Sequence, residues 1–254
     1  MPMLERHGVR IYYEIAGDRS GAPPLLLSHG FSASARMWEP NVPALSADRQ
    51  VITWDLRGHA RSEAPDDPGA YTEALAIEDM LALLDTAGAE RAVLGGQSLG
   101  GFLSLAFHVR HPERVAGLVL VDTGPGYRRD EARAGWNAHC EQIAAGLDRD
   151  GLAGLSTGAE VANAAHRDAR GLALAARGIM AQHDATVIES LPSIRVPVLI
   201  VVGAEDAPFL AAADAMAAKI PGATKVVLDR AGHAANLDQP DEFNRAVLQL
   251  LAWV

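Results

Sequence analysis

A single cysteine, Cys140, occurs in this sequence of 254 residues, so no internal disulfide can form. That usage fits a reducing compartment. The most apolar stretch, "VPVLIVVGA" at 196–204, is far shorter than a membrane span and predicts a buried strand instead. The first residues, "MPMLERHGVR", carry charges early and lack the apolar segment of a secretory signal. We therefore expect a cytoplasmic protein with no membrane partner.

Concentrated positive charge is absent as well. The chain has 22 Lys and Arg against 32 Asp and Glu, a formal net charge of −10, and no basic stripe. Nucleic acids are bound through clustered positive charge, so we expect no nucleic-acid partner. Neither G-x-G-x-x-G nor a G-K-[ST] ending is present, and the 9 histidines show no metal-ligand spacing. We expect neither a cofactor nor a metal.

Short apolar runs alternate along the chain with segments of helical periodicity. The runs are continuous, which is typical of strands buried on both faces of a parallel sheet. Strands are expected at 25–27, 51–54, 92–94, 118–121, 198–202 and 225–228. Helices are expected at 37–47, 72–87, 99–109, 211–220 and 241–253, and an opening hairpin or edge strand at 8–17. This alternation predicts an α/β fold with a mostly parallel, doubly wound sheet.

Residues 124–190 interrupt this alternation of expected strands and helices. They contain no strand-like run, only segments of helical character rich in Ala and Gly, and their charges nearly balance. The strand pattern resumes at Val198. We therefore expect a core formed by 1–123 and 191–254, with a helical insertion at 124–190.

Four glycines surround one serine in "GGQSLGG" at 95–101. The pattern G-x-S-x-G, placed between a strand and a helix, is the nucleophile elbow of hydrolases. In such a turn the serine adopts a strained conformation, and side chains at 96 and 100 would clash with it. The glycines therefore indicate that Ser98 is an exposed nucleophile, and Gly101 that the following helix packs closely on the sheet. A helix-capping serine in a glycine-rich turn is the alternative.

A serine nucleophile needs a base, and the base needs a carboxylate that fixes its tautomer. His233 follows the strand expected at 225–228, near the last helix, and is the favoured base. Asp206 directly follows the strand at 198–202 and is the favoured acid. Asp122, at the end of the preceding strand, competes with it, because the chain order Ser, Asp, His holds for either residue.

The oxyanion that forms during such a reaction needs two N–H donors. One is expected from Leu99, directly after the nucleophile. The other is expected from Phe31 in "SHGFSAS", where Gly30 lets the loop bend close to the serine. We expect His29 to stabilise this loop by hydrogen bonding rather than to act in catalysis.

With these residues in place, the chain resembles the α/β-hydrolase superfamily over essentially its whole length. The motifs are "HGF" at 29–31, "DLRGHARS" at 55–62, "GGQSLGG" at 95–101, "HPERVAGLVLVD" at 111–122, "VVGAEDAPF" at 201–209 and "AGH" at 231–233. The resemblance implies a triad of Ser98, Asp206 and His233, oxyanion donors at Phe31 and Leu99, and a cap at 124–190 over the pocket. Ala60 stands where the pattern D-x-R-G-x-G-x-S has glycine, a difference that bears on the conformation of that loop.

A serine at the nucleophile position, Ser98, limits the classes of reaction that the resemblance allows. Haloalkane dehalogenases and epoxide hydrolases of this fold use an aspartate at this position. The resemblance leaves carboxylesterases, lactonases, thioesterases, C–C bond hydrolases of ring-fission products and haloperoxidase or perhydrolase relatives. We expect a metal-free serine hydrolase that forms an acyl-enzyme on carboxylic esters. A lyase of this fold can keep the whole triad, whereas a non-catalytic binding member would be expected to lack part of it.

The residue composition of the insertion at 124–190 indicates which kind of substrate to expect. Trp136 and Tyr127 are its only Trp and Tyr, and its many small side chains predict an open, largely apolar pocket. Arginines 128, 129 and 133 are candidates to meet a substrate carboxylate, although at helix positions such residues are more often solvated. We therefore expect small to medium uncharged esters, with a carboxylate-bearing dienone as the alternative. The natural substrate and the oligomeric state stay open.

Overall fold

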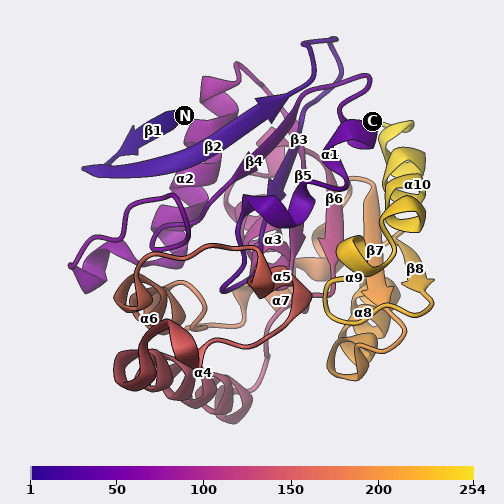
Figure 1. Ribbon diagram of the computed structural model, residues 1–254. Coiled ribbons are helices and arrows are strands. Elements are labelled where there is room, and N and C mark those ends of the chain that lie inside the picture. Colours follow the sequence, from indigo (N-terminus) through magenta and orange to yellow (C-terminus); the bar gives the residue numbers. More distant parts are fainter. Residues whose placement is uncertain (1) are drawn as a thin grey trace.

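The computed structural model describes residues 2–254, which form one eight-stranded sheet flanked by helices (Figure 1). In spatial order the strands are β1 (Met3–Arg6), β2 (Val9–Ala16), β4 (Val51–Trp54), β3 (Leu25–Ser28), β5 (Ala92–Gln97), β6 (Val115–Val121), β7 (Val198–Gly203) and β8 (Thr224–Leu228). The pairs β1–β2 and β2–β4 are antiparallel, and the other pairs are parallel. The predicted mostly parallel sheet is confirmed, and residues 8–17 belong to an opening hairpin.

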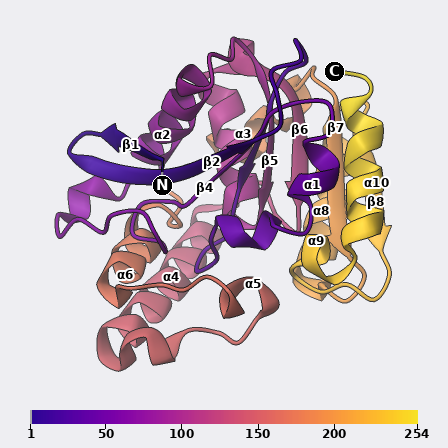
Figure 2. The same ribbon diagram turned by 45° about the horizontal axis from the view of Figure 1, so that its top comes forward.

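Helices cover both faces of this sheet, as Figure 2 shows. Leu26 and Ile52 face the cluster that contains α2 (Glu73–Thr86), α3 (Leu99–Arg110) and α8 (Ala207–Lys219). Leu27 and Val51 face the opposite cluster, with α1 (Val42–Leu45) and α10 (Pro240–Leu251). Burial on both faces explains the continuous apolar runs of the central strands. It does not extend to β8, where Thr224, Lys225 and Val227 are exposed because this strand forms an edge of the sheet.

The single helix expected at 37–47 is wrong. The chain forms a short 3₁₀ helix, η1 (Ala35–Trp38), and then α1, with a break between them. Pro40 lacks the N–H that a continuous helix needs and would clash with the preceding turn. At the break the buried Asn41 side chain donates to the carbonyl of Asn236, 3.2 Å away, and to Oδ1 of Asn244, 3.0 Å away. Asn41 thus links the segment between η1 and α1 to the C-terminal helices.

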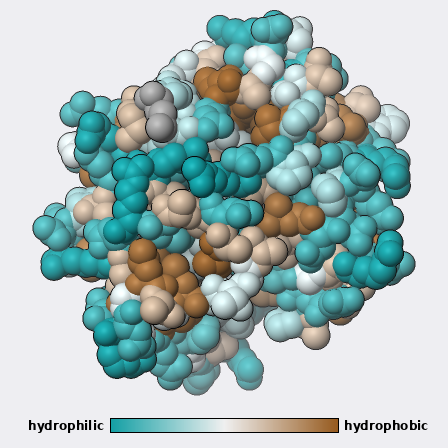
Figure 3. Space-filling view, viewed as in Figure 1, coloured by the Kyte–Doolittle hydropathy of each residue, from teal (hydrophilic) through white to brown (hydrophobic). Residues whose placement is uncertain are grey.

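Between β6 and β7 the described chain forms helices and turns without a strand. The helices are α4 (Asp130–Asp150), η4 (Gly151–Gly154), α5 (Ala159–Ala162), α6 (Ala169–Gly178), α7 (Thr186–Ser190) and η5 (Leu191–Ser193). Figures 1 and 2 show this cap-like region gathered at one end of the sheet. On the face drawn in Figure 3, hydrophobic residues gather over it near α6, amid largely hydrophilic surroundings. We keep 124–190 as its proposed bounds.

The cap-like region shares its core with one face of the sheet. Ala144 and Leu147 of α4 and Leu172 of α6 belong to the same buried cluster as α2 and α3. At the surface Arg177 pairs with Glu141 at 2.7 Å and with Asp148 at 2.8 Å. Within residues 2–254, none of the helices combines the length and the hydropathy that a membrane span needs.

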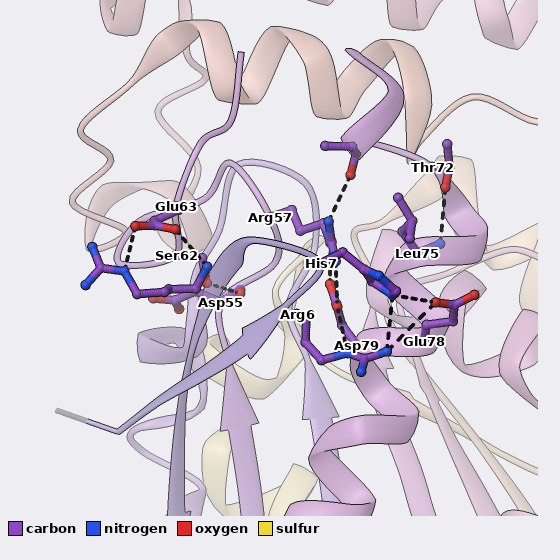
Figure 4. A network of polar contacts seen from close by, with 12 residues as sticks. Arg6, His7, Asp55, Arg57, Ser62, Glu63, Thr72, Leu75, Glu78 and Asp79 are labelled. Carbon is purple, nitrogen blue, oxygen red and sulfur yellow. Dashed lines mark hydrogen bonds and ion pairs between the residues drawn. The ribbon is translucent and has the colours of Figure 1, made fainter. Parts of the chain in front are cut away.

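A buried ion pair holds the loop after β4 against α2. Arg57 donates to both carboxylate oxygens of Asp79, at 2.5 and 2.8 Å, and both side chains are buried (Figure 4). Burial raises the pKa of Asp79, and the hydrogen bond and charge of Arg57 offset only part of that rise. Arg57 also donates to the carbonyl of Ala70, 3.3 Å away. The loop that carries residues 55–63 is therefore anchored on one side by a charge contact that excludes water.

Asp79→Asn is expected to lower the free energy of unfolding by about 3–5 kcal/mol, because it leaves the Arg57 guanidinium buried without a counter-charge. Urea denaturation followed by circular dichroism measures the change. The double variant Arg57→Met/Asp79→Leu should recover most of the loss. The control is Asp85→Asn on the same helix, whose exposed side chain pairs with Arg114; it should cost less than about 1 kcal/mol. A loss equal to that of the control would contradict the assigned role of this pair.

Candidate active site

Four polar residues follow four neighbouring strands at one edge of the sheet. Ser98 follows β5, Asp122 follows β6, Asp206 lies just beyond β7, and His233 lies in the loop after β8. The strands are parallel, so their carboxyl ends meet at one edge, where open α/β sheets bind their ligands. The sequence-predicted serine, acid and histidine are therefore brought to the same part of the molecule.

Ser98 sits in a backbone conformation that L residues rarely adopt, with φ 52° and ψ −115°. A Cβ at Gly96 would lie 2.2 Å from the carbonyl carbon of Gly100, and one at Gly100 would lie 2.2 Å from the carbonyl oxygen of Ser28. A Cβ at Gly101 would lie 2.5 Å from Cγ2 of Thr123, two residues beyond β6. The glycines are thus required for the close approach of helix α3 to the sheet, as the motif predicts.

His233 is held by contacts on three sides. Its Nδ1 donates to Oδ2 of Asp206 at 2.8 Å, and its Nε2 has no hydrogen-bond partner among residues 2–254. The ring of Phe209 stacks on the imidazole, with centroids 4.7 Å apart and planes at 29°. Nε2 of Gln97 donates to the His233 carbonyl at 2.6 Å. The residue next to Ser98 is therefore bonded to the loop that carries the histidine.

Asp122 makes different contacts from those of Asp206. Its Oδ1 accepts from the amide of Gly203 at 2.8 Å, and its Oδ2 from the amide of Ala235 at 2.9 Å. Burial raises the pKa of Asp122 to about 6, although these two amides act in the opposite direction. Its carboxyl group joins the end of β7 to the segment after His233. Of the two acids considered, only Asp206 hydrogen-bonds to the imidazole.

The two expected oxyanion donors flank the serine. Leu99 is the first residue of α3, and Phe31 lies in the turn after β3. A Cβ at Gly30 would lie 3.2 Å from Cβ of Ser98 and 2.0 Å from Oε1 of Gln97, so the loop passes close to the serine only because residue 30 is glycine. In the part of the chain that is described, 2–254, neither the Phe31 nor the Leu99 amide donates a hydrogen bond to another protein group.

His29 stabilises this loop, as expected. Its Nδ1 donates to the carbonyl of Gly30 at 2.7 Å, and its Nε2 accepts from the amide of Leu56 at 2.9 Å. Burial lowers the pKa of His29 to about 3. A neutral imidazole with both nitrogens bonded has no capacity left for proton transfer.

Several charges act on His233. Burial lowers the pKa of its imidazole, but the hydrogen bond and charge of Asp206, with the charges of Asp122 and Glu160, outweigh burial and raise it above its ordinary value. Glu160, the weakest of these charges, belongs to α5, so part of the charge that acts on His233 comes from the cap-like region. No group of three or more His, Cys, Asp or Glu side chains within residues 2–254 is arranged to hold a metal ion.

The sequence alone left some contributors unnoticed. Gln97 is a variable position of the elbow motif, and Phe209 comes one turn after Asp206, so both offered a local signal. Glu160 offered none, because its position depends on how the insertion folds. Arg133, a candidate carboxylate anchor, instead donates to the carbonyls of Tyr127 and Arg128, at 3.0 and 2.8 Å, and pairs with Asp130. Arg128 faces Glu189, with its Nε 4.0 Å from the carboxylate.

A parallel sheet with a serine elbow, an acid and a histidine at successive strand ends defines an α/β hydrolase architecture. The sequence profile of the alpha/beta hydrolase family matches residues 25–246, and the chain belongs to this family. It is therefore a hydrolase of α/β fold.

Proteins similar to this chain are named for activities on different bonds. A protein of Pseudomonas savastanoi pv. phaseolicola provisionally named carbamate hydrolase RutD is 31% identical, over 92% of this chain and 95% of its own length. The crystal structure of the enol-lactonase from Burkholderia xenovorans LB400 is similar with a TM-score of 0.79 and 29% identity, over 99% of this chain and 100% of that one. A thermophilic esterase from Thermogutta terrifontis is similar with a TM-score of 0.83 and 27% identity, over 99% and 96%.

Asp206→Asn is expected to lower the pKa of His233, because it removes the hydrogen-bonded carboxylate that most opposes the effect of burial. The titration of the imidazole by NMR, assigned with His233→Gln, measures the shift. Asp122→Asn is the matched control and should produce a smaller fall, since Asp122 acts on the ring only through its charge. A larger fall in Asp122→Asn would assign the imidazole to the other acid.

Proposed function

We propose that the protein is a serine hydrolase in which Ser98, His233 and Asp206 form a catalytic triad. The observation that carries the proposal is the 2.8 Å bond from His233 Nδ1 to Asp206, at the sheet edge where Ser98 is held in a strained turn. A serine hydroxyl is a weak nucleophile until a base accepts its proton. The free Nε2 of His233 is the base, and Asp206 holds the imidazole in the required tautomer and stabilises its charged form.

The reaction proceeds in two halves. Ser98 Oγ attacks the carbonyl carbon of the ester while Nε2 of His233 takes its proton, and the amides of Phe31 and Leu99 bind the oxyanion. The tetrahedral intermediate collapses as His233 returns the proton to the leaving alcohol, which leaves an acyl-enzyme on Ser98. Water then attacks the acyl group with His233 again as base. The second tetrahedral intermediate collapses as His233 returns the proton to Ser98 Oγ, which breaks the bond to the acyl carbon and releases the carboxylic acid. The positive end of α3 favours the negative charge at both tetrahedral stages.

Small to medium uncharged carboxylic esters are the proposed substrates. Asp206 and Glu160 give the surroundings of His233 a negative character, which opposes the approach of an anionic substrate. The aromatic rings of Phe31 and Phe209 and the small side chains of residues 124–190 favour an apolar acyl or alcohol group. The carboxylate-bearing dienone loses support, because Arg133 is bonded to protein groups. Lactones, which are cyclic esters, gain support from the similarity to an enol-lactonase.

Ser98→Ala tests the nucleophile. Without the attacking oxygen, kcat for p-nitrophenyl ester hydrolysis should fall by on the order of a million-fold, while circular dichroism and Tm stay close to those of the wild type. Labelling by a fluorophosphonate probe should disappear in the same variant. Ser193→Ala, at an exposed serine, serves as control and should keep both activity and labelling. A Ser98→Ala variant with more than about a tenth of wild-type activity would end the assignment.

Glu160→Gln tests the electrostatic basis of the substrate proposal. For two esters that differ only by a distal carboxylate, the ratio of kcat/KM for the anionic ester to that for the neutral one should rise roughly two- to fivefold, the usual size of a partly screened charge contact. The acid limb of the pH profile should move to lower pH, since the base must be neutral and a charge that raises the pKa of His233 is lost. Glu189→Gln, at the carboxylate that faces Arg128, should change neither. An unchanged ratio in Glu160→Gln would refute this account of the preference.

A further inference from the structure

One histidine of the cap-like region, His166, contacts two separate loops of the core. Its Nε2 donates to the carbonyl of Ser32 at 2.7 Å, and its Nδ1 accepts from the amide of Ala60 at 3.1 Å. Ser32 belongs to the loop after β3 and Ala60 to the loop after β4. A single half-buried imidazole between α5 and α6 therefore joins three segments that are distant in the sequence.

Both partners of His166 have unusual backbone conformations. Ser32 has φ 57° and Ala60 has φ 42°, in the left-handed region that favours glycine, and neither residue is glycine. Such conformations persist only where the surroundings hold them. The carbonyl of Ser32 and the amide of Ala60 are the atoms that His166 bonds, so its two hydrogen bonds act directly on these two residues.

The loop around Ser32 has its other fixed points within the core. The amide of Ala33 donates to the carbonyl of Gly30 at 3.2 Å, and the amide of Ala35 donates to Oδ1 of Asp55 at 2.7 Å. The ring of Phe31 meets the ring of His59 edge-on at 5.6 Å.

The cap-like region supplies the remaining support for this loop. The ring of His59 also meets the ring of His166, with centroids 5.7 Å apart. The cap-like region thus contacts the loop that carries Phe31 directly through the carbonyl of Ser32. It also acts on this loop indirectly, because the ring of His166 meets that of His59 edge-on and His59 meets Phe31 in the same way.

We propose that His166 is a positioning residue that keeps the Phe31 amide directed toward the serine, so that the oxyanion hole is complete only when the cap-like region is docked. The Ser32 carbonyl belongs to the residue that follows Phe31, and rotation at Ser32 would turn the whole Gly30–Ala33 turn. The hydrogen bond from His166 opposes that rotation. This inference rests on the proposed function, because Phe31 acts as a donor only in that mechanism.

Two substitutions separate the two bonds of the imidazole. In His166→Gln the side-chain amide nitrogen lies near the position of Nε2 and can still donate to Ser32, while the bond to Ala60 is lost. In His166→Asn the side-chain oxygen lies near the position of Nδ1 and can accept from Ala60, but the side chain is too short to reach Ser32. His166→Ala removes both bonds. His183→Ala, at an exposed histidine of the same region, is the matched control.

We expect kcat per active site to fall about tenfold or more in His166→Ala and His166→Asn, while KM changes less than about threefold. Removal of a whole oxyanion donor costs about a hundred- to a thousand-fold, and a misplaced donor loses part of that. His166→Gln should keep at least half of the wild-type kcat, and His183→Ala all of it. Active sites are counted by fluorophosphonate titration, so that a poorly folded fraction does not count as a slow enzyme.

The outcomes are distinguishable. Equal kcat per titrated site in His166→Asn and His166→Gln, or a lower Tm with unchanged kcat, would overturn the positioning role and leave the serine mechanism intact. Should His166→Ala fail to fold, the comparison of Gln with Asn still decides. If the wild type is not labelled and Ser98→Ala remains active, the proposed function itself fails, and the inference with it.

Discussion

The backbone conformation of Ser98 is the constraint on which the rest of the site depends. With φ 52° and ψ −115°, this residue needs neighbours without side chains and a set of hydrogen bonds that hold it. Its amide donates to the carbonyl of Val121 at 2.9 Å, and its carbonyl accepts from Oγ1 of Thr123 at 2.6 Å. Both partners belong to β6 or to the residues directly after it. The serine is therefore fixed to the neighbouring strand as well as to its own, which explains why the elbow depends on a buried parallel sheet.

Asp206 and Asp122, which follow neighbouring strands, make different kinds of contact. Asp206 contacts the imidazole of His233. Asp122 instead accepts from the amide of Gly203, just before Asp206, and from the amide of Ala235, just after His233. A buried carboxyl that accepts two amide hydrogen bonds joins β6, β7 and the start of α9 (Ala235–Asp238). Asp206, Asp122 and Glu160 together raise the pKa of His233. In the proposed mechanism the imidazole must be neutral to act as base, so the carboxylate that orients it, Asp206, also limits how far into acid the reaction can run. Positioning and pH range are thus coupled in this site.

Features of the fold and site that depend on residues close together in the sequence could be predicted from it. Features that depend on contacts between distant segments could not. Apolar runs identified the central strands because both sheet faces are covered, and they overstated the burial of β8 because an edge has no outer neighbour. The periodicity at 37–47 predicted one helix, but Pro40 interrupts it. The glycines around Ser98 were interpretable because they form one short motif, even though two of them lie against Ser28 and Thr123, which are distant in the sequence. The choice between Asp122 and Asp206 depended on side-chain distances across the sheet. Glu160 and His166 lie in an irregular insertion whose folding no short pattern describes.

Backbone strain is concentrated around the candidate site. Seven of the described non-glycine residues have a positive φ, and five of them lie around the candidate site. Ser98 and Asp122 follow strands of the sheet, and Ser32 follows Phe31 in the chain. Ala60 donates to His166, and Ala165 precedes His166 in the chain. Each such residue costs on the order of 1 kcal/mol, so the loops would relax if the packed sheet and the cap-like region did not hold them. Ala60 shows this dependence most simply, because its methyl group makes the left-handed conformation costly and the bond from its amide to His166 offsets that cost. A histidine that bonds a strained alanine in one loop and a strained serine in another makes the conformations of both loops depend on the same cap contact.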